Sequence, residues 1–426
     1  MSATQSQSNS GPAAQAAQAG PPAGEPVVVS RRPVFDREGR VFALGLSFWR
    51  EPESDADLSR TIADGFALAV RTQPRDRRVL IDFPAELLLR GAAFSLPKDV
   101  CIVGISEPVY PTSELLPACM RLKEAGYTLA AAGLTGKPGS EPLLSLADMV
   151  RVNARGLTTG ELIGFTQRVR PFGRKLLAEQ VEDTETLLLL RSLGYSYFQG
   201  GYFDRPQIVP GRPLGAGEVS RLKLLGELGR AELDHDALEL IIGSDIALTY
   251  RLMQFVNSAG FGLGRGVDSV AQALTLAGNR ALRQWLMVVL VSDMAATPRT
   301  EEVALASARR ARFLELAAGA APDPEAPPET LFLFGLFSKL DVLLGQPMRE
   351  IVDRLPLTDA LLRPLAGELT PLSDWLILLE GLEADAFPAA KAVMERRGLS
   401  LEVCARCHAE ASLWAWNMLS ARPQDG

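Results

Sequence analysis

Between residues 30 and 206 the sequence alternates between short apolar runs and longer stretches of helical periodicity, and the alternation ends at Pro206. The apolar runs are residues 41–48, 79–83, 100–105, 128–131, 149–152, 176–181 and 196–202. Helical stretches such as 56–70 and 113–125 lie between them. Because a strand that returns to its sheet through a helix runs parallel to the preceding strand, this pattern predicts a parallel α/β fold.

Seven strand–helix units suit a barrel better than a short open sheet, so we predict a trimmed TIM-like (β/α) barrel. A doubly wound sheet is the alternative, but no Gly-rich phosphate loop joins a strand to a helix here. The segment is about 180 residues long, whereas a (β/α) barrel usually takes about 250. We therefore expect the barrel to be incomplete.

The second half of the chain has no strand pattern and predicts an all-helical domain. Ser244 and Ser269 are expected to cap two helices, and Asn279 to begin a third. Residues 331–344 are apolar around most of a helical circumference, which predicts one central helix of a bundle. The predicted organisation is a disordered tail (1–29), a barrel (30–206), a Pro/Gly-rich linker (207–217), a helical domain (218–420) and a short tail (421–426).

The overall charge argues against several classes of partner. The formal net charge is −7 and the sequence pI is about 5.2, so the chain has no overall excess of positive charge that would attract nucleic acid or an anionic membrane. No apolar run reaches the roughly 18 residues of a membrane-spanning helix. Four cysteines and no secretion signal favour reduced thiols, so we expect a cytoplasmic protein.

Three segments of the first half resemble landmarks of the EAL family, barrel phosphodiesterases that hydrolyse the bacterial messenger cyclic di-GMP. They are residues 32–37 (RPVFDR), 176–182 (LLAEQVE) and 197–200 (YFQG), and they occur in the family's order. The resemblance implies a site at the carboxyl ends of the strands, where such barrels carry their functional residues. It also implies divalent cations that activate water and neutralise phosphate charge.

The resemblance identifies positions of this chain with the family's functional positions. Those that keep an oxygen-bearing side chain are Asp82, Glu107, Glu179 and Gln199. Those that lose the family's residue are Gly45 (the signature glutamate), Trp49 (the phosphate-gripping arginine), Gly104 (the first glutamate of an E-x-x-E pair), Ala132 and Gly133 (paired aspartates) and Arg151 (the catalytic lysine).

These replacements remove most of the oxygen ligands that two hard cations would need. An arginine stays protonated and does not replace a lysine whose pKa can be tuned. We therefore expect no enzymatic activity, no bound metal and no cofactor in the barrel.

The second half resembles the HDOD domain, a helical relative of the HD metallohydrolases that lacks their metal-binding histidines. The resemblance covers residues 252–259 (LMQFVNSA), 267–278 (VDSVAQALTLAG) and 334–356. The chain contains only two histidines, His235 and His408, which are too few for an HD di-metal site. The two modules in this order are similar to EAL–HDOD signalling proteins of bacteria.

Cys404 and Cys407 precede His408 in a C-x-x-C-H pattern typical of c-type haem attachment. Haem attachment of this kind takes place after export, and no export signal is recognised. The surrounding stretch has helical periodicity, and free cysteines are commonly small buried packing residues. We favour a packing role for both over a haem, zinc or redox role.

The sequence therefore predicts a non-catalytic signalling scaffold of the cyclic di-GMP network that binds protein partners. One alternative is a receptor that binds cyclic di-GMP or another nucleotide in the barrel. Another is a residual cyclic di-GMP phosphodiesterase. Nucleic-acid and membrane partners are not expected, and the oligomeric state is not predicted.

Overall fold

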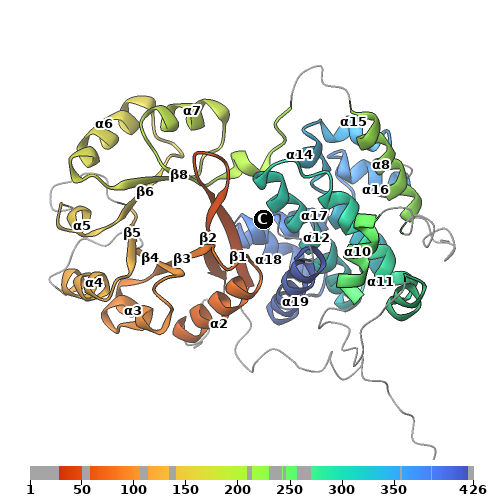
Figure 1. Ribbon diagram of the computed structural model, residues 1–426, viewed down its shortest axis with the longest axis horizontal. Coiled ribbons are helices and arrows are strands. Elements are labelled where there is room, and N and C mark those ends of the chain that lie inside the picture. The colour runs from red at the N-terminus through yellow and green to blue at the C-terminus, as the bar shows by residue number, and fades with distance from the viewer. Residues whose placement is uncertain are drawn as a thin grey trace, which may run out of the picture.

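The computed structural model describes residues 28–49, 58–105, 114–133, 141–208, 214–229, 242, 246–256, 270–355, 357–384 and 386–420. These residues form a barrel and a helical half that lie side by side (Figure 1). Strands β1 and β2 lie on the side of the barrel that faces the helical half.

Eight strands close the barrel in chain order, which confirms the predicted barrel and excludes the doubly wound sheet. Strands β2 to β8 pair in parallel, and β1 is antiparallel to both of its neighbours, β2 and β8. The strands are β1 (Val28–Phe35), β2 (Val41–Trp49), β3 (Arg78–Phe83), β4 (Cys101–Ile105), β5 (Thr128–Ala131), β6 (Met149–Asn153), β7 (Lys175–Glu179) and β8 (Tyr197–Phe198).

The expectation of an incomplete barrel is wrong, because β1 supplies the strand that closes it. This strand contains Arg31, Arg32 and Pro33, so it does not read as an apolar run. It is held by a tight turn in which Asp36 Oδ1 accepts hydrogen bonds from the backbone of Glu38 at 3.0 Å and of Arg40 at 2.8 Å. The turn brings β1 antiparallel onto β2.

The last strand is shorter than the predicted run 196–202. Gly200 has φ +152°, and a Cβ built there would lie 2.2 Å from the backbone nitrogen of Val181. Glycine is therefore required where the chain turns away from the sheet into the 3₁₀ helix η3 (Gly201–Asp204).

Helices cover the outside of the barrel between successive strands. They are α2 (Leu58–Arg71), α3 (Ala85–Leu89), α4 (Leu115–Glu124), α5 (Glu141–Leu146), α6 (Thr159–Val169) and α7 (Thr184–Ser192), with 3₁₀ helices η1 (Ala92–Ser95) and η2 (Arg170–Phe172). Local signals set their starts: Thr158 and Glu161 form a reciprocal capping box at α6, and Asp183 caps α7. Their apolar faces and the outward side chains of the strands form one core.

The second half is all-helical, as predicted. Its helices are α8 (Ala216–Leu228), α10 (Ile246–Val256), α11 (Val270–Ser292), α12 (Pro298–Ala320), α13 (Pro328–Phe337), α14 (Leu340–Leu344), α15 (Met348–Val352), α16 (Asp359–Leu365), α17 (Ser373–Glu383), α18 (Phe387–Arg396) and α19 (Leu401–Leu419). Gly278, at φ +74°, breaks α11 just before Asn279, where a new helix was expected. The predicted caps Ser244 and Ser269 lie outside the described residues.

The expectation of one central helix over 331–344 is wrong. The chain leaves helical geometry between α13 and α14, where Ser338 accepts a hydrogen bond from Arg310 of α12 at 3.0 Å. Helix α13 packs closely on α12 because Gly335 has no side chain: a Cβ there would lie 2.7 Å from the backbone oxygen of Arg310. Hydrophobicity around the whole circumference shows burial, but it does not show where a helix ends.

The barrel and the helical half are joined by specific contacts. Trp49, at the end of β2, stacks on Phe387 of α18 with ring centroids 5.0 Å apart. Ser30 of β1 donates a hydrogen bond to the backbone oxygen of Glu383 at 3.0 Å. Arg299 of α12 donates to the backbone oxygens of Phe203 at 2.8 Å and of two neighbouring residues. The end of the barrel segment is thus fastened to the start of α12.

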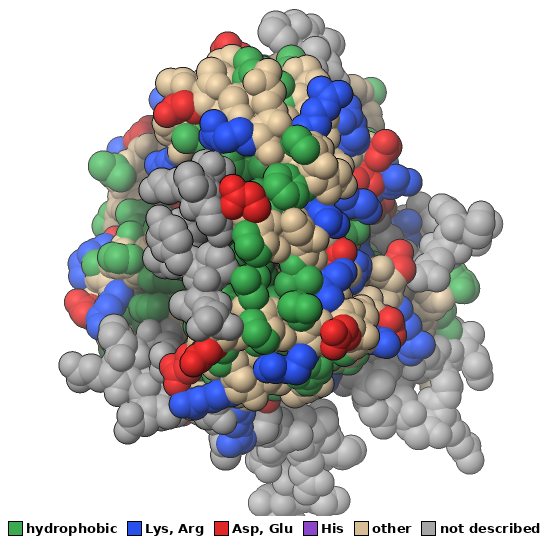
Figure 2. Space-filling view, turned by 90° about the vertical axis from the view of Figure 1, so that its left-hand side faces the viewer, with side chains coloured by type: hydrophobic (Ala, Val, Ile, Leu, Met, Phe, Trp, Pro, Cys, Tyr) green, Lys and Arg blue, Asp and Glu red, His purple; other side chains and the backbone are tan. Residues whose placement is uncertain are grey.

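The barrel face turned away from the helical half carries hydrophobic side chains among charged ones (Figure 2). Exposed apolar residues on α3, η1 and α4 include Leu89, Phe94 and Met120. Within the described ranges, no helix combines the length and the hydropathy needed to cross a membrane.

Candidate functional site

The inside of the barrel is built from two layers of inward-facing side chains. The lower layer is almost entirely apolar and consists of Val34, Ala43, Leu80, Ile102, Ala130, Met149, Leu177 and Tyr197. Side chains alternate between the two faces of a strand. The residue two positions further along β2 to β8, and two positions earlier on the antiparallel β1, therefore also faces inward. The upper layer, at the carboxyl ends of the parallel strands, therefore consists of Arg32, Gly45, Asp82, Gly104, Ala132, Arg151, Glu179 and Gln199.

Seven of the ten positions singled out in the sequence thus lie in one layer. Ala132 and Gln199 directly follow their strands and continue the backbone hydrogen bonding of the sheet. The backbone nitrogen of Ala132 donates to the backbone oxygen of Ile105 at 3.0 Å, and that of Gln199 donates to the backbone oxygen of Ala178 at 2.8 Å. Gly133 lies one residue beyond Ala132 with φ +69°. The structure therefore gathers widely separated sequence positions at one end of the barrel.

Of the other two positions, one lies away from this layer and the other is not described by the structure. Trp49 stands where the resemblance implies a phosphate-gripping arginine, but its ring packs on Phe387 at the contact with the helical half. Glu107 lies outside the described residues.

Arg151 is the centre of the upper layer. Its Nη2 lies 3.0 Å from Asp82 Oδ2 and 2.7 Å from Glu179 Oε1, and its Nε donates to the same Glu179 oxygen at 2.9 Å. Its Nη1 pairs with the other oxygen of Asp82. One guanidinium therefore bridges β3, β6 and β7, and all three of its nitrogens are used.

Electrostatics keep Arg151 charged in this position. The Arg151 side chain is 7% exposed, against 17% for Glu179 and 38% for Asp82. Burial by itself lowers the pKa of Arg151, but the carboxylates of Glu179 and Asp82 overcome burial and raise this pKa above the ordinary value of an arginine. The group is therefore a permanent cation and not a proton donor or acceptor.

Gln199 occupies the space left by a glycine on β2. Its Nε2 donates to the backbone oxygen of Arg32 at 3.0 Å. A Cβ built at Gly45 would lie 2.9 Å from the same Nε2. Arg32 in turn donates from Nη2 to Ser47 Oγ at 3.0 Å. Sequence reasoning missed Arg32 as a member of this layer, because β1, on which it lies two residues before the inward-facing Val34, does not read as an apolar run.

The residues present do not fit the pair of divalent cations that the EAL resemblance implies. Hard cations take six or more oxygen ligands, mostly carboxylates and carbonyls. Gly45 and Gly104 offer no side-chain oxygen, and the two retained carboxylates that the structure describes, Asp82 and Glu179, are already bound by Arg151. In the described parts of the chain, no group of three or more His, Cys, Asp and Glu residues is arranged to hold a metal ion.

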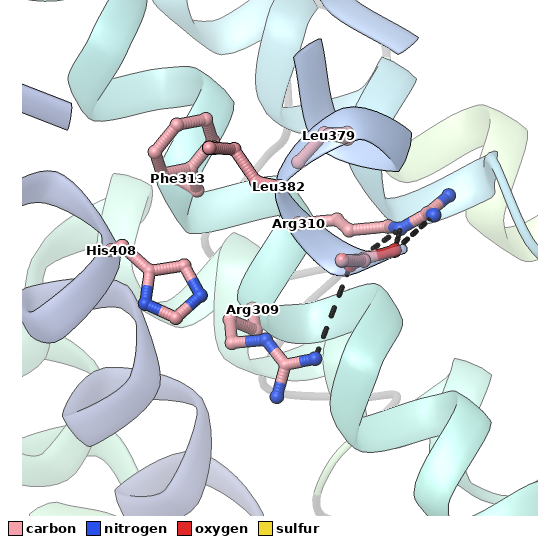
Figure 3. Close-up of a pocket in the computed structure, with 7 residues that line it drawn as sticks. Arg309, Arg310, Phe313, Leu379, Leu382 and His408 are labelled. Atoms are coloured by element: carbon pink, nitrogen blue, oxygen red, sulfur yellow. Dashed lines mark hydrogen bonds and ion pairs between the residues drawn. The ribbon is translucent and has the colours of Figure 1, made fainter. Parts of the chain in front are cut away.

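The helical half contains a second cluster of buried polar groups, around a small cavity lined by Arg309, Arg310, Phe313, Leu379, Leu382, Glu383 and His408 (Figure 3). Arg310 Nε donates to both oxygens of Glu383, at 3.0 and 3.1 Å. The imidazole of His408, on α19, points toward α12, and burial followed by the positive charges of Arg309 and Arg31 lowers its pKa to about 3. His408 is therefore neutral at physiological pH, while His235 lies outside the described residues.

The cysteines are buried and free in the described structure. Burial raises the pKa of Cys404 to about 12 and of Cys407 to about 11, so neither is a ready thiolate. Both sit on the buried face of α19 with Ala411 and Ala415. This placement supports the packing role favoured from the sequence.

Comparisons with known proteins connect both halves to bacterial signalling proteins. Residues 220–349 match the HDOD domain model, so the chain contains an HDOD domain. The whole chain is similar to the cyclic di-GMP phosphodiesterase CdgJ of Vibrio cholerae, with 29% identity over 91% of this chain and 92% of that protein. It is also similar to the uncharacterized protein YuxH of Bacillus subtilis, with 26% identity over 93% of this chain and 100% of that protein.

Solved structures also resemble part of the chain. A PaMucR phosphodiesterase in complex with cyclic di-GMP has a TM-score of 0.33 and 16% identity, over 45% of this chain and 93% of that one. An EAL domain protein of Listeria monocytogenes EGD-e has a TM-score of 0.32 and 15% identity, over 42% of this chain and 87% of that one.

The relationship to CdgJ corrects one expectation. The sequence analysis expected no enzymatic activity, because most of the family's functional positions are replaced. A similarity that extends over nearly the full length of a protein named as a phosphodiesterase contradicts that expectation. The expectation rested on the number of replaced residues. It assumed that only the family's own set of side chains can serve this barrel, and the similarity to CdgJ does not support that assumption.

Proposed function

We propose that this chain acts in cyclic di-GMP signalling and that its barrel binds the dinucleotide at the carboxyl-terminal end. The single observation that carries the proposal is the similarity to the Vibrio cholerae phosphodiesterase, which spans both halves of this chain. The upper layer of the barrel is compatible with such a ligand. Among the described side chains of this layer, Arg32 and Arg151 balance Asp82 and Glu179, so these side chains have no formal net charge that would repel two phosphates.

The proposal assigns different roles to the two halves. The barrel (30–206) is the ligand-binding domain, and the HDOD half (218–420) passes the ligand state to a protein partner in the cytoplasm. The contacts of Arg299 with the end of the barrel segment support a relay between the halves. The buried free cysteines accord with a reducing compartment.

Calorimetric titration with cyclic di-GMP tests the binding site. Ala132 follows β5 in the upper layer, so Ala132→Trp fills the end of the barrel. Ser145 is exposed on α5, at the opposite end, so Ser145→Trp adds the same bulk as a matched control. We expect saturable binding by the wild type and by Ser145→Trp, and its loss in Ala132→Trp. Absence of binding by the wild type, or binding unchanged in Ala132→Trp, would refute the proposal.

Hydrolysis of the dinucleotide is a second candidate, favoured by the name of the Vibrio cholerae relative. Formation of linear dinucleotide, followed by chromatography with magnesium or manganese present, tests it. If hydrolysis takes place in this layer, Glu179→Gln abolishes product formation and Ser145→Trp does not. Product formed equally by the wild type and Glu179→Gln would place the activity elsewhere.

A further inference from the structure

We propose that the guanidinium of Arg151 takes the electrostatic place of a metal ion inside the barrel. Accordingly, Asp82 and Glu179 become a divalent-cation site when Arg151 is replaced by a neutral residue. The proposal concerns cation binding by these two carboxylates and does not depend on the dinucleotide binding proposed above, whereas metal-dependent hydrolysis at Glu179 would exclude it.

The geometry of Arg151 is that of a central cation with carboxylate ligands. Asp82 approaches the guanidinium from β3 and Glu179 approaches it from β7, on the far side of β6 from each other. Four contacts join the three guanidinium nitrogens to three carboxylate oxygens. A charged group that neutralises two carboxylates from separate strands does what a bound divalent ion does in a metal site.

Gly104, on β4, leaves the space that the ion pair between Arg151 and Asp82 occupies. A Cβ built at Gly104 would lie 2.2 Å from Asp82 Oδ1 and 2.9 Å from Arg151 Nη1. The ion bridge therefore fills the volume that any side chain at position 104 would occupy. Gly104 and Arg151 work as a pair, because a carboxylate at 104 and the observed guanidinium cannot occupy the same space.

Removing the guanidinium takes from both carboxylates the counter-ion that Arg151 supplies. Breaking a buried ion pair from one side is costly, because the remaining charge stays desolvated. Glu179 is 17% exposed and cannot turn fully into water, whereas Asp82 at 38% leaves room for water ligands. A hard cation bound by two carboxylates and several waters restores the charge balance, with an expected Kd of about 0.1–1 mM, typical of weak calcium modules.

Arg151→Met tests the proposal, because methionine is unbranched and neutral. In EDTA we expect its Tm to fall below that of the wild type. Mn²⁺ or Ca²⁺ at about ten times Kd should then raise the Tm of the variant by about 3–6 °C. The wild type and Arg151→Lys, which keep a cation in place, should not respond. Arg151→Met combined with Glu179→Gln is the matched control, and it should lose the response because it retains only one carboxylate.

Each possible outcome either supports or overturns the proposal that Arg151 takes the place of a metal ion. A cation response in Arg151→Met that the double variant lacks supports the proposal, and so does a single variant that folds only when the cation is present. An Arg151→Met protein that is neither stabilised nor refolded by any of the cations overturns it. Binding of Mn²⁺ by the wild type, measured by water proton relaxation and lost in Glu179→Gln, also overturns it, because Arg151 would then not occupy the cation's place. None of these measurements uses the dinucleotide, so they are independent of the test of the proposed function.

Discussion

Acid should destabilise this protein through one histidine. His408 is buried on α19 and faces Arg309 of α12, Arg31 of β1 and Glu383 of α17. Burial, followed by the charges of the two arginines, lowers its pKa from 6.5 to about 3. The folded protein therefore does not bind the proton that the unfolded chain takes up below pH 6.5.

The sign and size of the effect follow from proton linkage. Between these two pKa values the unfolded state holds one more proton, so stability falls as pH falls. Each pH unit costs about 1.4 kcal/mol, so the loss from His408 by pH 5 is about 2 kcal/mol. A single domain has only about 5–15 kcal/mol of stability, so this loss is measurable.

Urea unfolding at pH 7.5 and pH 5.0 measures the effect. His408→Gln removes the titrating group and should lose about 2 kcal/mol less than the wild type over this interval. His235→Gln is the matched control, because it removes the other histidine of the chain. Asp204 and Asp341 have pKa values raised by burial and act in the opposite direction, but they are present in every variant and cancel in the comparison.

Histidine NMR checks the same reasoning directly. The imidazole signals assigned to His408 should stay unchanged down to about pH 4.5, because its pKa is lowered to about 3. A His408 signal that titrates near pH 6.5, or an equal loss of stability in wild type and His408→Gln, would show that the charge environment has been misjudged.

Three further substitutions test the packing and the joint between the halves. Gly335→Ala should lower the free energy of unfolding by about 1–3 kcal/mol, because its methyl group would meet the backbone of Arg310; unchanged urea unfolding would contradict the close approach of α12 and α13. Arg299→Ala removes three hydrogen bonds to backbone oxygens, so limited proteolysis should cut between the halves faster, and an unchanged cleavage rate would argue against this joint. Trp49→Ala should cost about 1–3 kcal/mol by removing the stacking on Phe387, whereas Trp49→Phe should retain most of it; equal effects of the two substitutions would rule out stacking as the cause.

Much of the barrel could be predicted from the sequence because its strands are locally encoded. Runs such as 79–83 and 100–105 are buried on both faces, so they stand out as apolar stretches whatever their neighbours are. β1 could not be found in this way, because Arg31 and Arg32 interrupt its apolar character. It pairs with β2, the next strand along the chain, and with β8, the last strand of the barrel segment. The pairing with β8 forms only when the barrel closes.

The candidate site was likewise predictable only in part from the sequence. Their placement at the carboxyl ends of the strands was implied by the family resemblance, and the structure brings Asp82, Glu179 and Gln199 to the same end of the barrel. Nothing in the sequence pattern showed that Arg151 would bind two of them. The ion bridge joins residues 69 and 28 positions apart, and its geometry exists only after the strands have paired.

The sequence by itself determined the class of each half, since strand and helix patterns, turn residues and caps act over a few neighbouring positions. Only the tertiary structure decided that the barrel closes, that one guanidinium neutralises two carboxylates, and that Trp49 serves the joint between the halves. These features are contacts between distant segments, and charge, burial and volume at such contacts are set jointly by side chains that lie far apart along the chain.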